Sequence, residues 1–295
     1  MSLAWRRLVA HRGAVVGAVL VVGLIAIAVL APLVATRDPL ASDVEHGLSA
    51  MGAPLPPSEG AVLGTDPLGR DVWARVVAGA RSSLVIAGAA TAIALAIGLA
   101  VGLIAGFRGG AVDSALMRLV DLVLAFPFLL LAILLAALFR EADLASSNAP
   151  VFLTLGLVSW TTIARVIRGK TRVLARGDMV TAARALGAGP ARIVLRHVLP
   201  SVAGLVVALT ALGFAQALLS EAALSYVGLG PPPPTPTWGR MLYEGRAYYR
   251  TAPHLVLVPG IAILVAVVGF NLLGEGLRDA FDPRTGRRSA GEDRR

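Results

Sequence analysis

The stretch Gly13–Ala35 reads GAVVGAVLVVGLIAIAVLAPLVA and has no charged residue in its 23 positions. At about 1.5 Å per residue, a helix of this length reaches about 34 Å, which is enough to cross a bilayer core about 30 Å thick. The flanking Arg6, Arg7 and Arg12 could also belong to a signal peptide. However, the run exceeds the usual apolar core of about 7–15 residues and no small-x-small cleavage site follows it. We therefore predict an uncleaved first transmembrane helix.

Five further apolar runs follow along the chain. They are continuously apolar rather than alternating, which favours helices over barrel strands as the way to satisfy backbone hydrogen bonds in lipid. The sequence thus predicts an all-α, polytopic membrane protein with six transmembrane helices. The expected spans are Gly13–Ala35, Leu84–Phe107, Leu119–Phe139, Val151–Val166, Val202–Gly228 and Leu255–Gly274.

The composition excludes several other classes of protein. Of the 295 residues, 56% are apolar and only 15% are charged, which is too apolar for an ordinary soluble domain. The chain has no cysteine, so disulfide frameworks, thiolate metal sites and cysteine nucleophiles are ruled out. Its four histidines show no ligand spacing, and we expect neither a metal ion nor a cofactor.

The basic excess follows the expected topology. The net charge is +9, from 27 Lys and Arg against 18 Asp and Glu. With the N-terminus in the cytoplasm, 19 of the basic residues fall on the inner side and 8 on the outer side. This asymmetry fits the positive-inside rule and predicts that both termini are cytoplasmic. Nucleic acid is therefore not needed as a partner, whereas the lipid bilayer is.

These spans divide the chain into four expected parts. Residues 1–36 hold the N-terminus and the first helix, and residues 37–83 form an extracytoplasmic loop. In that loop Asp71 is expected to cap a short helix that runs from Val72 to about Ala80. Residues 84–275 form a core of five helices, which includes a cytoplasmic loop at 169–200, and residues 276–295 form a cytoplasmic tail.

The cytoplasmic loop contains a short amphipathic pattern. Residues 178–187 read DMVTAARALG, with apolar residues at helical spacing. We expect Asp178 to cap the start of this helix and Gly187 to follow its end. The expected apolar stripe consists of Met179, Ala182, Ala183 and Leu186.

A corner at Gly187-Ala-Gly189-Pro190 is then expected to lead into a second helix that runs to Pro200. Such a basic hairpin with an apolar stripe is suited to a groove on a partner protein. It is equally suited to the surface of anionic lipid, and the spacing leaves both possibilities open.

The segment Thr181-AARAL-Gly187, followed by Leu199-Pro200 twelve residues after the glycine, resembles the EAA loop of ABC-importer permeases. That loop is commonly written E-A-A-x3-G-x9-I-x-L-P. The resemblance implies a coupling helix that docks into a cytoplasmic ATPase, with Ala182, Ala183 and Gly187 as docking and hinge residues. Thr181 stands where the signature has Glu, and His197 stands where it has Ile. The expected docking loop comprises Asp178, Met179, Thr181, Ala182, Ala183, Leu186 and Gly187.

Four other segments resemble the C-type permeases of dipeptide, oligopeptide and nickel importers. They are LGTDPLGRD at 63–71, GLGPPPPTPTWG at 228–239, NLLGEGLRD at 271–279 and DPR at 282–284. The resemblance implies one of two membrane subunits in a bacterial or archaeal plasma membrane. Its implied partners are a second permease, two cytoplasmic ABC ATPases and an extracytoplasmic solute-binding protein. Peptides are the implied solute, and nickel chelates, glutathione or other small solutes stay open.

A relaxed phosphate-loop pattern occurs at Ala164-RVIR-Gly169-Lys170-Thr171. A phosphate-binding loop needs a buried strand before it, whereas these residues end an apolar helix. We therefore expect no catalysis by this chain, and ATP hydrolysis by separate subunits.

Within the spans, Gly98, Gly102 and Gly106 recur every fourth residue, which predicts close approach of another helix. Pro127 is expected to kink the third span.

Two polar residues of the fifth span are candidates for the translocation pathway. Glu221, with Gln216 nearby, must face protein or water, because a charge at the centre of a bilayer costs roughly 2.5–3.5 kcal/mol on insertion scales. It either lines the pathway or is a paired carboxylate near the helix end. Asp121 is expected to pair with Arg118 three residues earlier. The competing functions are a secondary transporter or channel and an integral-membrane enzyme.

Overall fold

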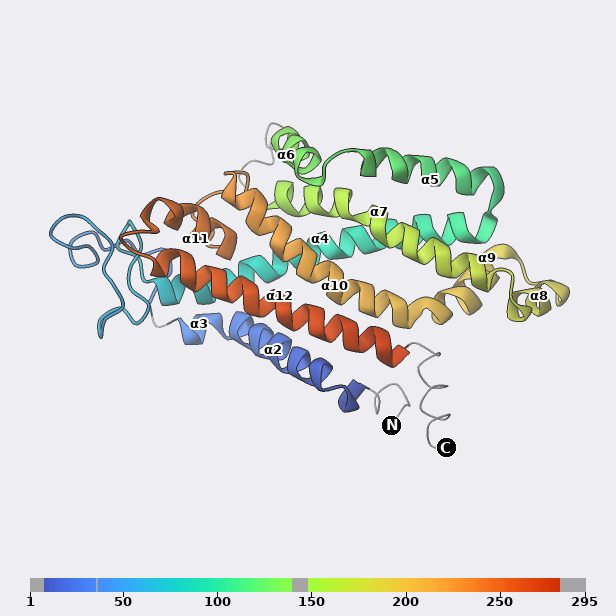
Figure 1. The fold of residues 1–295 in the computed structure, drawn as a ribbon, viewed down its shortest axis with the longest axis horizontal. Helices are drawn as coiled ribbons and strands as arrows, with labels where there is room; N and C mark the ends of the chain where they lie inside the picture. Colours follow the sequence, from blue (N-terminus) through green and yellow to red (C-terminus); the bar gives the residue numbers. More distant parts are fainter. Residues whose placement is uncertain (1–7, 36, 140–147, 282–295) are drawn as a thin grey trace.

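The computed structural model describes residues 8–35, 37–139 and 148–281 (Figure 1). Arg6, Arg7, the 282–284 motif and most of the expected tail lie outside these residues. The described chain is built from helices, which confirms the all-α prediction. The helices are α2 Arg12–Val29, α3 Ala31–Val34, α4 Val72–Arg108, α5 Gly110–Ala125, α6 Phe128–Phe139, α7 Ala149–Leu174, α8 Asp178–Ala185, α9 Pro190–Ile193, α10 Leu199–Tyr226, α11 Trp238–Gly245 and α12 His254–Phe281.

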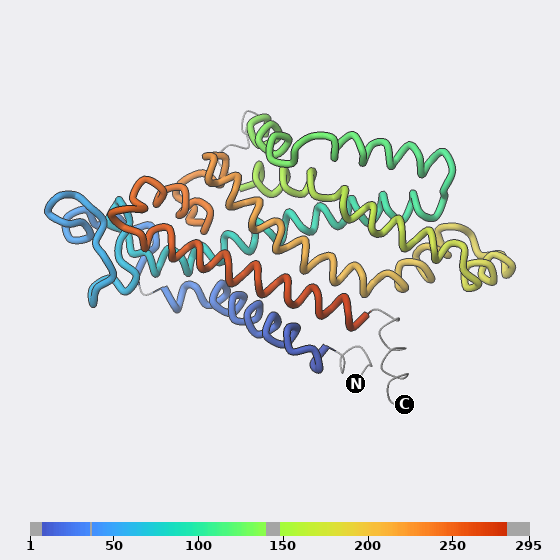
Figure 2. The backbone as a smooth tube through the Cα atoms, viewed as in Figure 1, coloured from blue at the N-terminus to red at the C-terminus, as the bar shows by residue number. Residues whose placement is uncertain are grey.

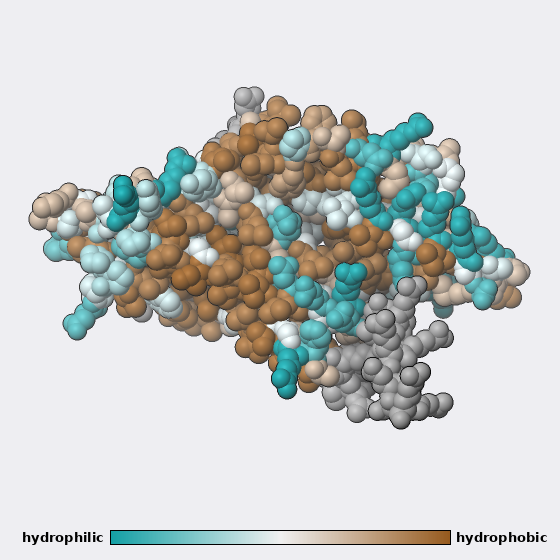
Figure 3. Space-filling view, in the orientation of Figure 1, coloured by the Kyte–Doolittle hydropathy of each residue, from teal (hydrophilic) through white to brown (hydrophobic). Residues whose placement is uncertain are grey.

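Five of the described helical segments are long and apolar enough to cross a membrane: α2, α4, α7, α9 continued into α10, and α12. Helices α5 and α6 make a sixth span if they are counted as one bent pair. An apolar belt covers the middle of the visible face, and polar side chains gather at both ends (Figure 3). Polytopic helical architecture with up to six spans agrees with the sequence prediction.

The bundle has two distinct ends. Helix α8 projects from one end, where α2 also begins and α12 stops; we call this the hairpin end (Figure 2). Residues 37–71 and α11 cover the opposite end, which we call the loop end.

The third expected span is broken rather than kinked. Helix α5 starts at Gly110, and α6 leaves it at an angle of 91°. Phe126 between them has an extended backbone with ψ 138°. A residue before proline is driven out of the helical region, and Pro127 itself cannot donate a backbone hydrogen bond, so the helix stops here.

Two elements expected to be separate are one helix. The Asp71 side chain caps α4 as predicted, accepting a hydrogen bond of 2.9 Å from the backbone N–H of Ala74. The helix then continues without interruption for 37 residues to Arg108, instead of ending near Ala80. The polar residues Arg81-Ser-Ser83 changed the hydropathy, but none of them breaks a helix.

Helices α4 and α7 pack closely along three glycines of α4. A Cβ atom added to Gly98 would lie 2.7 Å from the Cβ of Ile163, and one added to Gly102 would lie 2.7 Å from the carbonyl oxygen of Ala164. At Gly106 the corresponding distance, to the carbonyl of Arg168, is 2.6 Å. The glycine spacing thus lets two backbones approach at a distance that any side chain would prevent.

Candidate functional site

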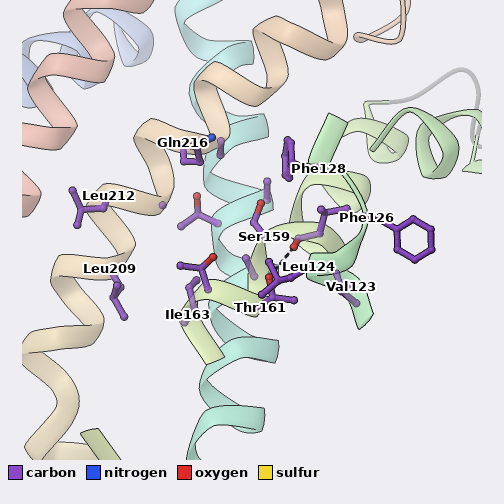
Figure 4. Close-up of a pocket in the computed structure, with 17 residues that line it drawn as sticks. Val123, Leu124, Phe126, Phe128, Ser159, Thr161, Ile163, Leu209, Leu212 and Gln216 are labelled. Carbon is purple, nitrogen blue, oxygen red and sulfur yellow. Dashed lines mark hydrogen bonds between the residues drawn. The ribbon is translucent and has the colours of Figure 1, made fainter. Parts of the chain in front are cut away.

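A cavity of about 510 Å³ lies between α4, α7, α10 and the junction of α5 with α6. Its volume is within the range of small-solute sites, about 300–1,000 Å³. Leu209, Leu212 and Gln216 of α10 line one side, and residues of α7 and of the α5–α6 junction line the other (Figure 4). The full lining is Ala90, Thr91, Ala94, Val123, Leu124, Phe126, Phe128, Val158, Ser159, Thr161, Thr162, Ile163, Leu209, Leu212, Gly213, Gln216 and Ala217.

The chemistry of this lining is apolar with a few neutral polar groups. Thr91, Ser159, Thr162 and Gln216 supply hydroxyl or amide groups, and none of the described lining residues is charged. The Thr91 hydroxyl donates to the carbonyl of Ala87 at 2.7 Å, so its remaining capacity is as an acceptor. Such a wall can hydrogen-bond a solute but has no acid or base for catalysis.

The two pathway candidates have different surroundings. Gln216 lines the cavity, whereas Glu221 does not. Glu221 is 1% exposed, and its Oε1 accepts hydrogen bonds from the hydroxyls of Ser225 at 2.7 Å and Thr237 at 2.9 Å. Glu221 thus ties α10 to the start of α11 through hydrogen bonds, and its role in the pathway stays a prediction.

The hairpin helix begins one residue earlier than expected. Gly177, not Asp178, is the N-cap, and Asp178 is the first helical residue. An acidic residue in the first turn is favourable there, because the helix dipole is positive at its N-terminus.

Gly187 follows the helix end, as the sequence predicted, with φ +77°. Its backbone N–H donates to the carbonyl of Arg184 at 2.9 Å, and the backbone N–H of Ala188 donates to the carbonyl of Ala183 at 3.0 Å. This Schellman pattern needs a left-handed residue at position 187, which explains the glycine.

The predicted apolar stripe of α8 divides between two faces. Ala183 is buried, together with Val180, which is fully buried and was not in the stripe. Met179 is 40% exposed, Leu186 is 88% exposed, and Ala182 is also exposed. Thr181 is exposed, and its hydroxyl donates to the Gly177 carbonyl at 3.3 Å. The inward pair packs α8 against the bundle, and the outward residues form an apolar face that none of the described residues covers.

The second hairpin helix does not end at Pro200. Pro190 starts α9 as expected, but the chain then passes through a π-helical turn, Val194–Val198, directly into α10. The N–H of Leu199 donates to the carbonyl of Val194, five residues back. Because Pro200 has no N–H to give, this wider turn keeps the helix continuous.

Asp121 has a different partner from the one expected. It pairs with Arg165 of α7, Oδ1 to Nη2 at 2.5 Å, and not with Arg118. Asp113, two turns earlier on α5, binds Arg168 and also lies 3.6 Å from Arg172. Spacing within one helix favoured Arg118, but α5 runs antiparallel to α7 and meets its arginines instead.

A buried ionic network at the loop end was not predicted. Glu244 Oε2 lies 2.9 Å from Arg75 Nη2 and 3.1 Å from Arg70 Nη2, and both arginines also pair with Asp66. Burial alone would raise the pKa of Glu244, but the charge of Arg75 and the hydrogen bond from Arg240 outweigh it, so the pKa lies below the ordinary value. Two arginines at the start of an apolar helix, Arg70 just before α4 and Arg75 in its first turn, were the signal in the sequence. Their partner Glu244, which is 174 residues from Arg70, could not be read from local spacing.

Two family models match the chain. The model described as binding-protein-dependent transport system inner membrane component matches residues 98–287. The model described as N-terminal TM domain of oligopeptide transport permease C matches residues 1–57.

Curated relatives match nearly the whole chain. The dipeptide transport system permease protein DppC of Alkalihalophilus pseudofirmus is 36% identical over 95% of this chain and 89% of its own length. The glutathione transport system permease protein GsiD of Shigella flexneri is 40% identical over the same shares.

A solved structure of the MetNI methionine ABC transporter, in an inward-facing conformation, has the same fold. Its TM-score is 0.55 at 21% identity, covering 70% of this chain and 96% of that one. Membership of a transporter family whose membrane subunits are not catalytic sets aside both the enzyme and the self-contained secondary transporter. The chain belongs to the binding-protein-dependent transport system inner membrane components: it is an oligopeptide-permease-C-type, multi-pass membrane subunit of an ABC importer, of the kind found in bacterial inner membranes, and it works with an ATPase and other transporter subunits.

Proposed function

We propose that this subunit forms one half of the membrane pathway of an importer for short peptides, either dipeptides and oligopeptides or glutathione. The observation that carries the proposal is the identity of 36–40% with relatives named for dipeptide and glutathione transport, each over 95% of the chain. Both solutes are short chains with amide groups and charged ends, so one class of cavity can serve either.

The uncharged lining of the cavity supports a role in the passage of a solute rather than in its tight binding. A pathway must bind its solute well enough to admit it and weakly enough to release it. Hydroxyl and amide groups such as those of Thr162 and Gln216 can replace some of the hydrogen bonds that a peptide loses with its water. With no charge in the described lining, neither end of a peptide is held by an ion pair.

In the complete complex, a second permease subunit of the same family would supply the other half of the pathway. Two ATPase subunits would bind at the hairpin end and a solute-binding protein at the loop end. Met179, Ala182 and Leu186 are the proposed ATPase contacts, because they form an exposed apolar face on a short helix surrounded by arginines.

ATP-driven movement of α8 would reach the bundle through two contacts. Val180 is buried in the hydrophobic cluster at the hairpin end, which also contains Ile167 and Val198. Arg184 lies over the ring of Phe107 at the end of α4, 5.4 Å from the ring centroid. Closure of the ATPases would thus shift α4 and α10 together and alternate the side to which the cavity opens.

Uptake by the purified complex tests the proposal. Proteoliposomes that contain both permeases and ATP-loaded ATPases would receive the solute-binding protein with a labelled dipeptide, glutathione or a nickel chelate outside. We expect uptake of a short peptide that requires both ATP and the binding protein. Uptake of the nickel chelate alone, or uptake that persists without the ATPases, would contradict it.

A further inference from the structure

All four tyrosines of the chain lie between residues 226 and 249, at the loop end. Three of them, Tyr226, Tyr243 and Tyr249, together with Arg240, Arg246 and Arg250, make up what we call the Tyr–Arg patch. The guanidinium carbon of Arg246 lies 4.1 Å from the ring centroid of Tyr243 and 5.7 Å from that of Tyr226. The guanidinium carbon of Arg240 is 5.0 Å from the Tyr243 centroid. These distances are within the range of cation–π contacts.

The patch carries positive charge that the described chain does not neutralise. Arg240 is paired with Glu244, but no carboxylate of residues 8–35, 37–139 or 148–281 lies within 4.0 Å of the exposed Arg246 or Arg250. Arg246 donates one hydrogen bond, from Nη1 to the carbonyl of Tyr226 at 2.9 Å. Its other N–H groups are available, and a stacked guanidinium presents them in a fixed plane that suits a carboxylate.

Helix α11, which carries Arg240 and Tyr243 of the patch and leads directly into Arg246, is firmly held. Trp238 is 1% exposed; its backbone N–H donates to the Ser83 hydroxyl at 3.1 Å and its indole N–H donates to the Val76 carbonyl at 2.9 Å. At the other end of α11, Glu244 pairs with Arg75. Patch side chains on such a support lose little freedom when a partner binds, which favours affinity.

Tyrosine and arginine also gather where a protein meets lipid headgroups. A helix that lies on lipid, however, turns its apolar face into the bilayer. The apolar residues of α11 point the other way, because Trp238 and Met241 are buried in the bundle at 1% and 5% exposure. What α11 offers outward is charged and aromatic, the composition of protein-binding hot spots.

We propose that the Tyr–Arg patch is a docking surface for an acidic face of the solute-binding protein. The proposal rests on the proposed function, which places that protein at the loop end. Charge on the rest of this end is consistent with it. Among the exposed charged side chains of the 37–71 segment, four are acidic and one, Arg37, is basic, so an acidic partner face would be attracted to the patch and repelled from the segment. These acidic residues are Asp38, Asp43, Glu45 and Glu59.

The test measures binding of the purified solute-binding protein to the whole complex in phosphatidylcholine nanodiscs. Arg246→Glu should weaken binding about tenfold or more, and Arg246→Lys, which keeps the charge but not the planar stack, should weaken it less. Arg250→Glu, at a fully surface position, should also weaken binding. The control is Arg37→Glu, because Arg37 is an exposed arginine at the same end but outside the patch. Its guanidinium lies 4.0 Å from the carboxylate of Asp71, so the thermal midpoint of this variant is measured in parallel.

Several results would overturn the inference. One is binding unchanged in both Arg246→Glu and Arg250→Glu; another is equal weakening by Arg37→Glu, which would reflect net charge alone. A third is unchanged protein binding combined with a lost preference for phosphatidylglycerol nanodiscs, which would make the patch a lipid site. If the wild-type complex itself shows neither binding nor stimulation by any solute-loaded binding protein, it is the proposed function that fails.

Discussion

Arg168 of α7 grips the carboxylate of Asp113 on α5 with two parallel contacts, Nε to Oδ1 at 2.5 Å and Nη2 to Oδ2 at 2.6 Å. Of the 16 residues of α5, only Asp113 and Val120 are buried. Two turns further along α5, Asp121 makes the second ionic contact, with Arg165. Since Val123 and Leu124 of the same helix line the cavity, this ionic ladder sets the position of one cavity wall.

Loss of the Asp113–Arg168 contact should free the part of α5 that lines the cavity. The Asp113 side chain is 8% exposed and that of Asp121 is 61% exposed, so Asp113→Asn should cost about 1–3 kcal/mol, against about 0.2–1 kcal/mol for Asp121→Asn. We expect Asp113→Asn to raise ATP hydrolysis in the absence of solute and Asp121→Asn to leave it near the wild-type rate. The measurement is basal ATPase activity of the reconstituted complex, with its thermal midpoint recorded in parallel. Equal basal rates in both variants would show that the ladder does not hold the wall.

The α4–α7 contact gives a matched pair of glycine substitutions. In Gly102→Ala the new methyl group would lie 2.7 Å from the carbonyl oxygen of Ala164, so the two helices must separate, at a cost of about 1–3 kcal/mol. Gly23 of α2 has no atom within 4 Å of the corresponding position, so Gly23→Ala should be neutral or slightly stabilising. Thermal unfolding of the purified complex compares the two. A loss of stability in Gly23→Ala as large as in Gly102→Ala would refute the packing explanation.

Substitutions can distinguish the exposed docking residues of the α8 hairpin from the residues that pack α8 against the bundle. Leu186→Asp acts on a side chain that is 88% exposed, so the subunit should fold normally while its ATPase is lost. Val180→Ala acts on a fully buried side chain and should lower the thermal midpoint instead. Co-purification of the ATPase and subunit stability are measured for both, with Val173→Asp as the control, since Val173 is 70% exposed at the same end but lies on α7. Full ATPase retention in Leu186→Asp would remove this face from the coupling surface.

Local spacing predicted what is decided locally. Charge-free runs located the spans, Asp71 capped its helix, and Gly187 followed α8 because only a left-handed residue closes that turn. The sequence did not predict the features decided by contacts between distant segments. Asp121 was assigned Arg118 because that was the nearest cation in sequence, whereas Arg165 lies 44 residues away.

The hairpin shows the same limit on a smaller scale. Helical spacing grouped Ala183 with Met179 and Leu186, yet the bundle beneath α8 selects Ala183 and Val180 as its seat. Helical spacing identifies the apolar side of a helix. On a short helix that contacts the bundle on one side and a partner protein on the other, it does not show which apolar residues contact which. Likewise, a proline predicts a disturbed helix, but its presence at position 127 did not predict the 91° angle between α5 and α6.

The loop-end network should make stability depend on pH. The folded-state pKa of Glu244 lies below its ordinary value of 4.5, so its contribution is complete above pH 4.5 and is lost as the pH falls through the lowered value. Glu244→Gln should remove about 1–3 kcal/mol at pH 7 and flatten the acid side of the profile. Thermal midpoints of the wild type and the variant between pH 3 and 7 measure both effects. Parallel profiles across that range would mean that Glu244 does not contribute through its charge.

Substitutions at Gln216 and Glu221 should affect different properties, transport in the first case and stability in the second. Gln216 lines the cavity, so Gln216→Leu should alter peptide KM or uptake rate by several-fold with little change in thermal midpoint. Glu221→Leu should do the reverse, because it leaves the hydroxyls of Ser225 and Thr237 without their acceptor, at about 1–3 kcal/mol for each group left unsatisfied, while its own side chain does not line the cavity. Uptake kinetics for two peptides of different length, measured alongside unfolding, distinguish the two roles. A Glu221→Leu complex with normal stability and changed peptide preference would return Glu221 to the pathway and require the cavity to extend to α11.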